Sequence, residues 1–333
     1  MKSVLGRAAW YRDRLAAMSA PEIVYRLVET ANKQTARWHS GGWEGVESFG
    51  LLTTIPGIRS RVIASSSDLS AVISCEAENV RAGRFCLLGA RWPKPSLIPP
   101  DPWFWSIDPA DGEPFPQWDA YAFDISFRHG LNTRDMKPIV ELNRLQFLVP
   151  LAADALVKKN DEFVLLAGMI RSWMAGNPPF RGPSWIYGID VALRLISVAA
   201  TLSIVGADRL DDVTRGKALR FFFAHLDWIK RFPSLHSSAN NHRIAELAGL
   251  VVGSIMAPGF PDAVALRENS WRALLAEIDR QIHPDGVGAE QSPSYAAFSI
   301  ELFLVAVTAL GREGSLPTTT ANRLSAWAEH SFG

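Results

Sequence analysis

The sequence predicts a mainly α-helical protein: an incomplete α/α toroid of antiparallel helical hairpins, preceded by a mixed, Pro- and Trp-rich N-terminal region. Apolar residues recur at helical spacing from about residue 135 to the end of the chain. The predicted helices are joined by short loops, so successive helices must pack as antiparallel hairpins. Residues 298–310 (FSIELFLVAVTAL) are apolar nearly all round, which is typical of a helix inside a double layer.

The N-terminal residues predict helices. Residues 8–38 follow a helical pattern that breaks near Ser19. Pro21 and Glu22 then fit the first turn of a new helix, because proline is tolerated there and acidic residues favour a helix start.

Residues 39–118 predict an irregular region with short strands. β-Branched pieces at 61–64 and 71–74 lie among Gly, Ser and Pro. Proline between 92 and 118 excludes long helices and central strands. The aromatic residues in this segment, Trp103 and Trp105 among them, predict an ordered loop pinned by its rings.

The pattern of the residues after 118 predicts the toroid. The predicted domains are therefore residues 1–118 and residues 119–333. An open α-solenoid is the alternative, although the chain shows no repeat of fixed period. After a helical pattern around 142–152, the predicted helices are 161–175, 187–204, 211–229, 240–256, 262–282, 292–311 and 318–330.

Composition excludes several classes of protein. The 333 residues carry 34 Lys and Arg against 34 Asp and Glu, so the formal net charge is zero. A dedicated nucleic-acid binder usually shows a basic excess, so no nucleic-acid partner is expected. Two cysteines, Cys75 and Cys86, are too few for a disulfide scaffold. Twelve tryptophans are many for this length, and their rings suit either sugar stacking or core filling.

The sequence shows no targeting or membrane signal. Arg7, Arg12, Asp13 and Arg14 interrupt every apolar run that could form a signal peptide. No window of about 18 apolar residues predicts a membrane span. We therefore expect a cytoplasmic protein, or a periplasmic or secreted one if a leader has been removed.

The first candidate site is the segment 237–243 (SSANNHR). It precedes an apolar periodic run and marks a helix N-terminus, where free backbone N–H groups and the helix dipole favour anions, especially carboxylates. Asn240 and Asn241 add amides, and His242 adds an imidazole. The alternative is that the asparagines only cap the helix and His242 is structural.

The second candidate site is the segment 285–295 (DGVGAEQSPSY). Its two glycines allow a turn that brings Glu290 and Gln291 to a helix start. Pro293 fits the first helical position, and Tyr295 then falls in the first turn. The alternative is that Tyr295 only packs its ring there.

The third candidate group includes Asn143, Arg144 and Trp185. Glu141 and Arg144 are three residues apart and could simply pair on a helix surface. Trp185 follows a Gly-Pro-Ser turn and could stack on the face of a sugar.

Motifs for cofactors and metals are absent. The chain has no GxxxxGK[ST] or GxGxxG phosphate loop, no CxxC or HExxH metal motif and no GxSxG nucleophile turn. His236 and His242 could bind a metal with Asp285, but six residues do not place both histidines on one helix face. The sequence therefore predicts neither a metal nor a cofactor.

Six strings in this order resemble the heparinase II/III family of polysaccharide lyases, from about residue 84 onward. They depart from the family where Val140 replaces a usual Trp and Asp190 a usual Glu. Each string is weak alone, but the six in order identify the family. The strings are 83–89 (GRFCLLG), 135–144 (DMKPIVELNR), 173–178 (WMAGNP), 188–194 (GIDVALR), 240–249 (NNHRIAELAG) and 285–295.

The resemblance implies a toroid followed by a large antiparallel β-sheet domain, which this chain lacks, so the 333 residues alone are expected to be inactive. Family members cleave uronic-acid polysaccharides by β-elimination, which implies an acidic polysaccharide or oligosaccharide as substrate. Asn241 and His242 would neutralise the uronate carboxylate, and Tyr295 would be the general base or acid. The implied substrate-binding residues are Asn143, Arg144, Trp185, Asn240, Glu290 and Gln291.

Two other functions remain open. The chain could be a catalytically silent saccharide-binding module, or a glycoside hydrolase of the α/α-toroid type with Asp285 and Glu290 as paired carboxylates. The net charge of zero argues against a very highly sulfated ligand. Arg144, Arg194 and Arg243 are nevertheless enough to bind one carboxylate.

Overall fold

The computed structural model describes residue 16 and residues 18–38, 42–87, 90–93, 101–108, 112–125 and 136–332. The chain divides into two compact units, residues 1–40 and 41–333, and each unit is described by itself. The predicted division at residue 118 stays a prediction.

The first unit contains helix α2 (Ala20–Trp38). The helix begins at the predicted break, because the Ser19 hydroxyl accepts the backbone N–H of Glu22 at 3.4 Å. Residues 8–15 of the predicted helical region lie outside the described residues. Large apolar side chains that α2 exposes are Val24, Leu27 and Val28.

The second unit opens with helices where the sequence predicted short strands. The predicted pieces 61–64 and 71–74 fall in α3 (Ile58–Ile63) and α4 (Ser67–Arg81), so the strand prediction is wrong. The Ser66 side chain caps α4 by accepting a backbone N–H at 3.3 Å. This cap and the burial of one α4 face outweigh the strand preference of β-branched residues.

A two-stranded hairpin and an aromatic segment follow. Strands β1 (Arg84–Leu87) and β2 (Ala90–Pro93) pair antiparallel. Trp105 is buried, and its indole N–H donates to Ser172 at 2.9 Å, which ties this segment to the bundle as predicted. Trp103 and Trp118 are instead about half exposed, at 56% and 48%, beside a cavity of about 440 Å³.

Helices make up most of the second unit beyond residue 136, and most of their bounds lie close to the predicted ones. The pattern predicted around 142–152 is instead divided between two helices, one ending at Leu142 and the next beginning at Leu148. The α-helices are α5 (Lys137–Leu142), α6 (Leu148–Lys158), α7 (Phe163–Gly176), α8 (Gly188–Val205), α9 (Asp212–Arg231), α10 (Asn241–Met256), α11 (Ala263–Gln281), α12 (Pro293–Leu310) and α13 (Thr318–Phe332). The short 3₁₀ turns of the unit are η1 (Trp43–Gly45), η2 (Pro102–Ser106), η3 (Ala122–Asp124), η4 (Pro183–Trp185), η5 (Ala207–Arg209) and η6 (His236–Ser238).

Helices α8 and α10 lie side by side and run parallel. A Cβ added to Gly249 of α10 would meet the Cβ of Ala192 at 3.0 Å, and one added to Gly253 would meet Leu195 at 2.9 Å. Residue numbers rise together along the two helices, so both N-termini lie at the same end of the bundle.

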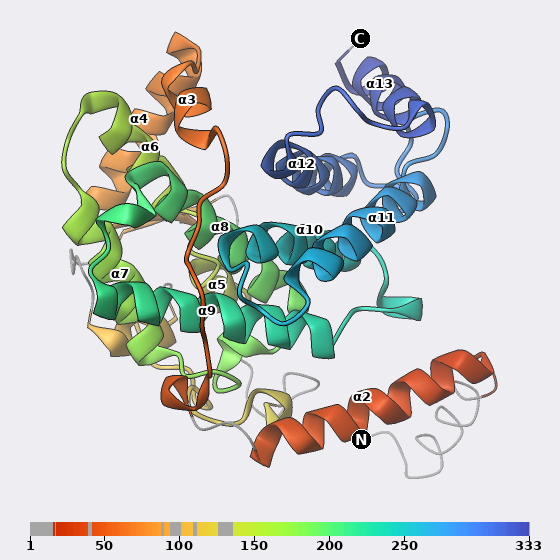
Figure 1. Ribbon diagram of the computed structural model, residues 1–333, viewed down its shortest axis with the longest axis horizontal. Coiled ribbons are helices and arrows are strands. Elements are labelled where there is room, and N and C mark those ends of the chain that lie inside the picture. Colours follow the sequence, from red (N-terminus) through yellow and green to blue (C-terminus); the bar gives the residue numbers. More distant parts are fainter. Residues whose placement is uncertain are drawn as a thin grey trace. The chain divides into compact units, whose positions relative to one another are not determined.

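Helix α9 runs antiparallel to α10. The α9 neighbour of Gly249 is Ile229, whereas that of Gly253 is Leu226, so numbers fall along α9 as they rise along α10. Helix directions thus alternate from α8 through α9 to α10, as predicted for helical hairpins. Figure 1 shows α8, α9 and α10 together, with α11, α12 and α13 continuing the series. The mainly α, incomplete toroid is confirmed.

Two helices, α8 and α12, are long and apolar enough to cross a membrane by length and composition alone. Because 83% of α8 is buried inside the bundle, it is the core helix of a folded unit. Only 44% of α12 is buried, and Leu304 lies on its exposed part. The prediction that 298–310 lies fully inside a double layer is therefore only half right.

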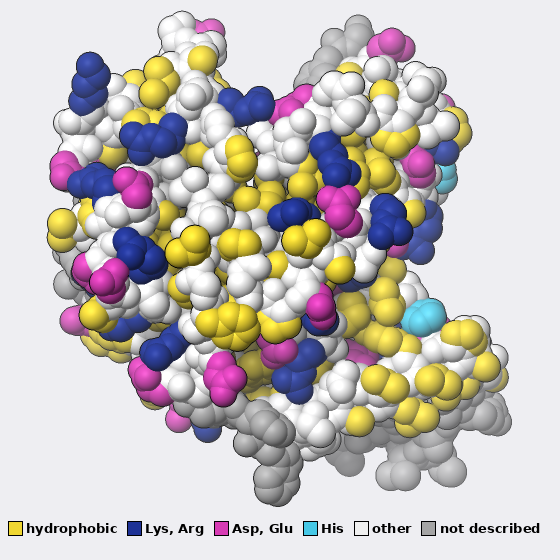
Figure 2. Space-filling model, in the orientation of Figure 1, with side chains coloured by type: hydrophobic (Ala, Val, Ile, Leu, Met, Phe, Trp, Pro, Cys, Tyr) yellow, Lys and Arg dark blue, Asp and Glu magenta, His cyan; other side chains and the backbone are white. Residues whose placement is uncertain are grey.

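Charged side chains of both signs are mixed over the face of the second unit in Figure 2. No single-sign patch dominates this face, in keeping with the zero net charge of the sequence.

Candidate functional site

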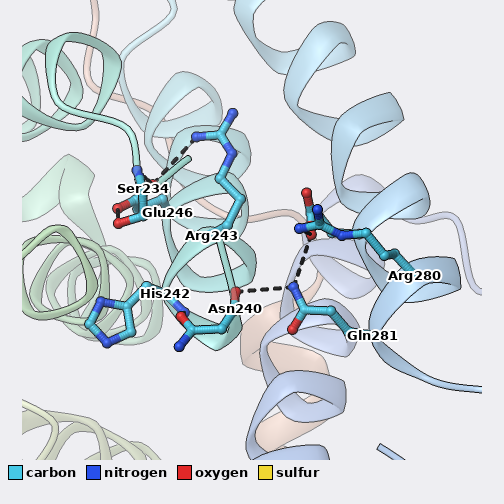
Figure 3. A network of polar contacts seen from close by, with 8 residues as sticks. Ser234, Asn240, His242, Arg243, Glu246, Arg280 and Gln281 are labelled. Carbon is cyan, nitrogen blue, oxygen red and sulfur yellow. Dashed lines mark hydrogen bonds and ion pairs between the residues drawn. The ribbon is translucent and has the colours of Figure 1, made fainter. Parts of the chain in front are cut away.

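The N-terminus of α10 begins at the predicted asparagines. Asn240 is the N-cap residue, and its side-chain oxygen accepts the backbone N–H of His242 at 3.1 Å. The backbone carbonyl of Asn240 accepts the N–H of Arg243 at 2.9 Å and the side-chain amide of Gln281 at 3.1 Å. The capping role is thus shown for Asn240, and Figure 3 shows Gln281 reaching it from α11.

Asn241 is bound twice by Glu290. One carboxylate oxygen of Glu290 accepts the backbone N–H of Asn241 at 3.0 Å, and the other accepts its side-chain amide at 3.1 Å. The first N–H groups of α10 are therefore filled by Glu290 and Asn240. The expectation of free backbone donors for a ligand anion is wrong, because an internal carboxylate takes that position.

His242 projects from the start of α10 on the side away from Gln281 (Figure 3). Burial lowers the pKa of His242; nearby Asp190 and Glu290 oppose this shift, whereas Arg144 adds to it. The imidazole is thus mainly neutral at pH 7, and no described residue makes a hydrogen bond with its ring. It can donate one N–H to a ligand and accept at the other nitrogen.

Arg144 lies between two carboxylates near His242. Its guanidinium pairs with Glu141 at 2.6 Å, which is the i,i+3 pair considered from the sequence, and with Asp190 at 2.8 Å. Asp190 is buried in the first turn of α8. The starts of α8 and α10 thus bring Asp190 and His242 into one electrostatic neighbourhood with Arg144, which follows the end of α5.

Glu246 fixes the loop that precedes the site. Its carboxylate accepts the backbone N–H of Ser234 at 2.8 Å and the Ser234 hydroxyl at 2.6 Å, and Arg243 pairs with it at 3.4 Å (Figure 3). Burial raises the pKa of Glu246, while these partners oppose the shift. Gly188 is required opposite this carboxylate, because a Cβ there would collide with it.

The turn before α12 places Glu290 against Asn241 of α10, whereas the residues on either side of Glu290, Ala289 and Gln291, are exposed to solvent. Gln291 is exposed, with a left-handed φ of 52°, and Ser292 and Pro293 start α12 as predicted. Tyr295 is 53% exposed, and no described residue hydrogen-bonds its hydroxyl. The substrate roles of Gln291 and Tyr295 stay predictions.

Two predicted substrate-binding residues lie in the core. Trp185 is 0% exposed, stacked on Phe180 and under the guanidinium of Arg194. Asn143 is also 0% exposed, and its amide accepts from Trp173 and donates to two backbone carbonyls. Neither side chain has a face for a sugar, so both predictions are corrected to structural roles.

Arg194 cannot bind a ligand carboxylate directly. It is fully buried and donates to His225, to the Asn143 carbonyl and to the Ser184 carbonyl at 2.9–3.1 Å. Burial lowers the pKa of Arg194 to about 9. Within the part of the chain that the structure describes, no three His, Cys, Asp or Glu side chains form a group that could hold a metal ion.

These features define the class of protein: an α/α-toroid chain with a polar site where two parallel helices begin. Residues 111–330 match the family described as Heparinase II/III N-terminus, and the chain therefore belongs to the heparinase II/III family. No curated protein matches the sequence.

Solved structures support the same fold. A structure titled Heparinase III superposes with a TM-score of 0.53 at 17% identity, over 86% of this chain and 41% of that one. The heparinase III BT4657 gene product gives 0.51 at 15% identity, over 91% and 46%. Heparan sulfate lyase HepC from Pedobacter heparinus gives 0.50 at 16% identity, over 82% and 42%. The chain spans less than half the length of each.

Proposed function

We propose that this chain is the helical part of a lyase that cleaves a uronic-acid-containing polysaccharide by β-elimination. The observation that carries the proposal is the arrangement at the start of α10: Glu290 holds the side-chain amide of Asn241, and the next residue is His242, whose pKa burial lowers. Membership of the heparinase II/III family and the fold shared with solved heparinase III structures and a heparan sulfate lyase support it.

The proposed chemistry begins at C5 of the uronate. Hydrogen-bond donors from Asn241 and His242 stabilise the negative charge that grows on the carboxylate as the C5 proton leaves. Tyr295 removes that proton as general base or protonates the leaving O4 as general acid. The C4–O4 bond breaks, a C4–C5 double bond forms, and O4 leaves with a proton.

Product chemistry tests this proposal against a hydrolase. Mass spectrometry of oligosaccharides, after incubation with the protein in its natural length, should show products one water lighter than hydrolysis products. Products that retain the water, with activity abolished by Glu290→Gln but not by Tyr295→Phe, would show a glycoside hydrolase instead. The structure gives that alternative no support, because Glu290 is already bound by Asn241.

A silent saccharide-binding module is the second candidate, and one observation favours it: the Asn241 backbone N–H and one hydrogen of its side-chain amide are already engaged by Glu290. Such a module would bind uronate oligosaccharides without turnover. Its binding would survive the double change Asn241→Ala and Tyr295→Phe, whereas lyase binding at the proposed site would be weakened.

A further inference from the structure

Glu290 occupies the position in which a helix attracts an anion. Its two carboxylate oxygens each accept one hydrogen bond from Asn241, at 3.0 and 3.1 Å. Backbone N–H groups and the helix dipole stabilise a carboxylate at this place. Bonds from two donors to one ionised group are also among the stronger hydrogen bonds in proteins.

Backbone hydrogen bonds stabilise the turn that carries Glu290. The Ala289 N–H donates to the Gln281 carbonyl at 2.7 Å, and the His283 N–H donates to the Val287 carbonyl at 2.9 Å. Gln281 also binds the Asn240 carbonyl from the end of α11. The helix start is therefore held from two sides by one folded segment.

We propose that Glu290 is a positioning residue that fixes the Asn241 amide, and that it does not contact substrate. This inference rests on the proposed function. With Glu290 in place, a substrate carboxylate has no backbone donor at the start of α10. It meets only the second amide hydrogen of Asn241 and the His242 imidazole, neither of which has a described acceptor.

We call the two hydrogen bonds from Asn241 to the Glu290 carboxylate the clamp. Replacement of Glu290 by Gln tests the clamp and nearly keeps the shape of the side chain. A glutamine offers one acceptor oxygen where the glutamate offers two, and its NH₂ group would face one of the Asn241 donors. Glu290→Ala removes both acceptors. Glu301→Gln is a matched control, because Glu301 is exposed on α12 and no described residue pairs with it.

The clamp itself is measured without ligand. In NMR spectra, the side-chain amide signals that disappear in Asn241→Ala belong to Asn241. In Glu290→Gln these signals should shift and their hydrogen exchange should become at least about tenfold faster, as expected for the loss of one charge-assisted hydrogen bond. Unchanged signals in a folded Glu290→Gln variant would overturn the clamp, whatever the protein's function.

Binding of an unsulfated glucuronate tetrasaccharide, followed by calorimetry, tests the consequence. We expect Glu290→Gln and Glu290→Ala to weaken binding about tenfold or more, which is the scale of one such hydrogen bond. The double variant with Asn241→Ala should bind no more weakly than Asn241→Ala alone, because Glu290 acts through Asn241. Glu301→Gln should bind as the unchanged protein does.

Three outcomes separate the positioning role of Glu290 from competition with substrate, from direct contact with substrate and from failure of the proposed function. Tighter binding by Glu290→Gln would show that Glu290 competes with the substrate carboxylate and would overturn positioning. A further loss in the double variant would mean that Glu290 touches substrate itself, which also contradicts the proposal. If the unchanged protein binds no tetrasaccharide while the NMR clamp is observed, the proposed function fails and the clamp stands.

Discussion

Buried polar residues form a connected group next to the candidate site. Asn143 accepts from Trp173 at 2.8 Å and donates to the Trp105 carbonyl at 2.9 Å, and Arg194 donates to His225 at 2.9 Å. Arg144, the neighbour of Asn143 in the chain, faces the site. The hydrogen bonds of Asn143 therefore fix the backbone that carries Arg144.

Asn143→Ala should destabilise the fold. It would leave the buried N–H of Trp173 and the Trp105 carbonyl without partners. We expect the free energy of unfolding to fall by about 2–4 kcal/mol in denaturant titrations. Asn322→Ala, at an exposed position on α13, should change it by less than about 0.5 kcal/mol. Equal effects of the two changes would contradict the structural role.

His225 should make stability depend on pH. Burial holds its pKa well below 6.5, whereas the unfolded chain protonates it near 6.5. As pH falls below that value the unfolded state takes up a proton that the folded state excludes. The free energy of unfolding should therefore fall by up to about 1.4 kcal/mol per pH unit for this group.

Denaturant titrations between pH 7 and 5 measure this slope. His225→Gln keeps a polar side chain that does not titrate. The free energy of unfolding of this variant should therefore change less steeply with pH, by the contribution of about one proton. The same slope in both proteins would show that His225 does not control the acid sensitivity.

At the level of elements, the contact between α8 and α10 depends on Gly249. A Cβ there would lie 3.0 Å from the Ala192 Cβ and 3.2 Å from its Cα. Gly249→Ala should therefore force the helices apart and lower the free energy of unfolding by about 1–3 kcal/mol.

Gly216→Ala on α9 is the matched control, since a Cβ there meets nothing within 4 Å. Alanine favours helix over glycine by about 1 kcal/mol, so this variant should be more stable. Thermal unfolding of both variants checks the contrast, and a stabilising Gly249→Ala would refute close packing of α8 on α10.

Helix bounds could be predicted where the signals are local. The 187–204 prediction lies one residue from α8 (Gly188–Val205), and Ser292 and Pro293 start α12 as expected. Burial could not be predicted in the same way. Trp185 follows a turn, yet its ring points into the core, because tertiary packing decides which way a turn faces.

Across the whole molecule, the site depends on long-range contacts. Glu290 and Asn241 are 49 residues apart, and Arg144 and Asp190 are 46 apart. Sequence strings named these residues but did not show that they bind one another. Ser234 and Gln281 were missed altogether, and so was Arg280, whose guanidinium donates to the Ala239 carbonyl at 3.2 Å. A polar side chain that supports a neighbouring helix has no local signature in the sequence.

The central claim is that Asn241 supports β-elimination on a uronate polymer. The most direct measurement is the near-ultraviolet absorbance of unsaturated uronate products, with the protein in its natural length and a panel of uronic-acid polysaccharides. We expect that absorbance rises with the unchanged protein and that Asn241→Ala, shown to be folded by circular dichroism, loses most of the rate. A folded protein that gives no absorbance on any of these polymers would contradict it.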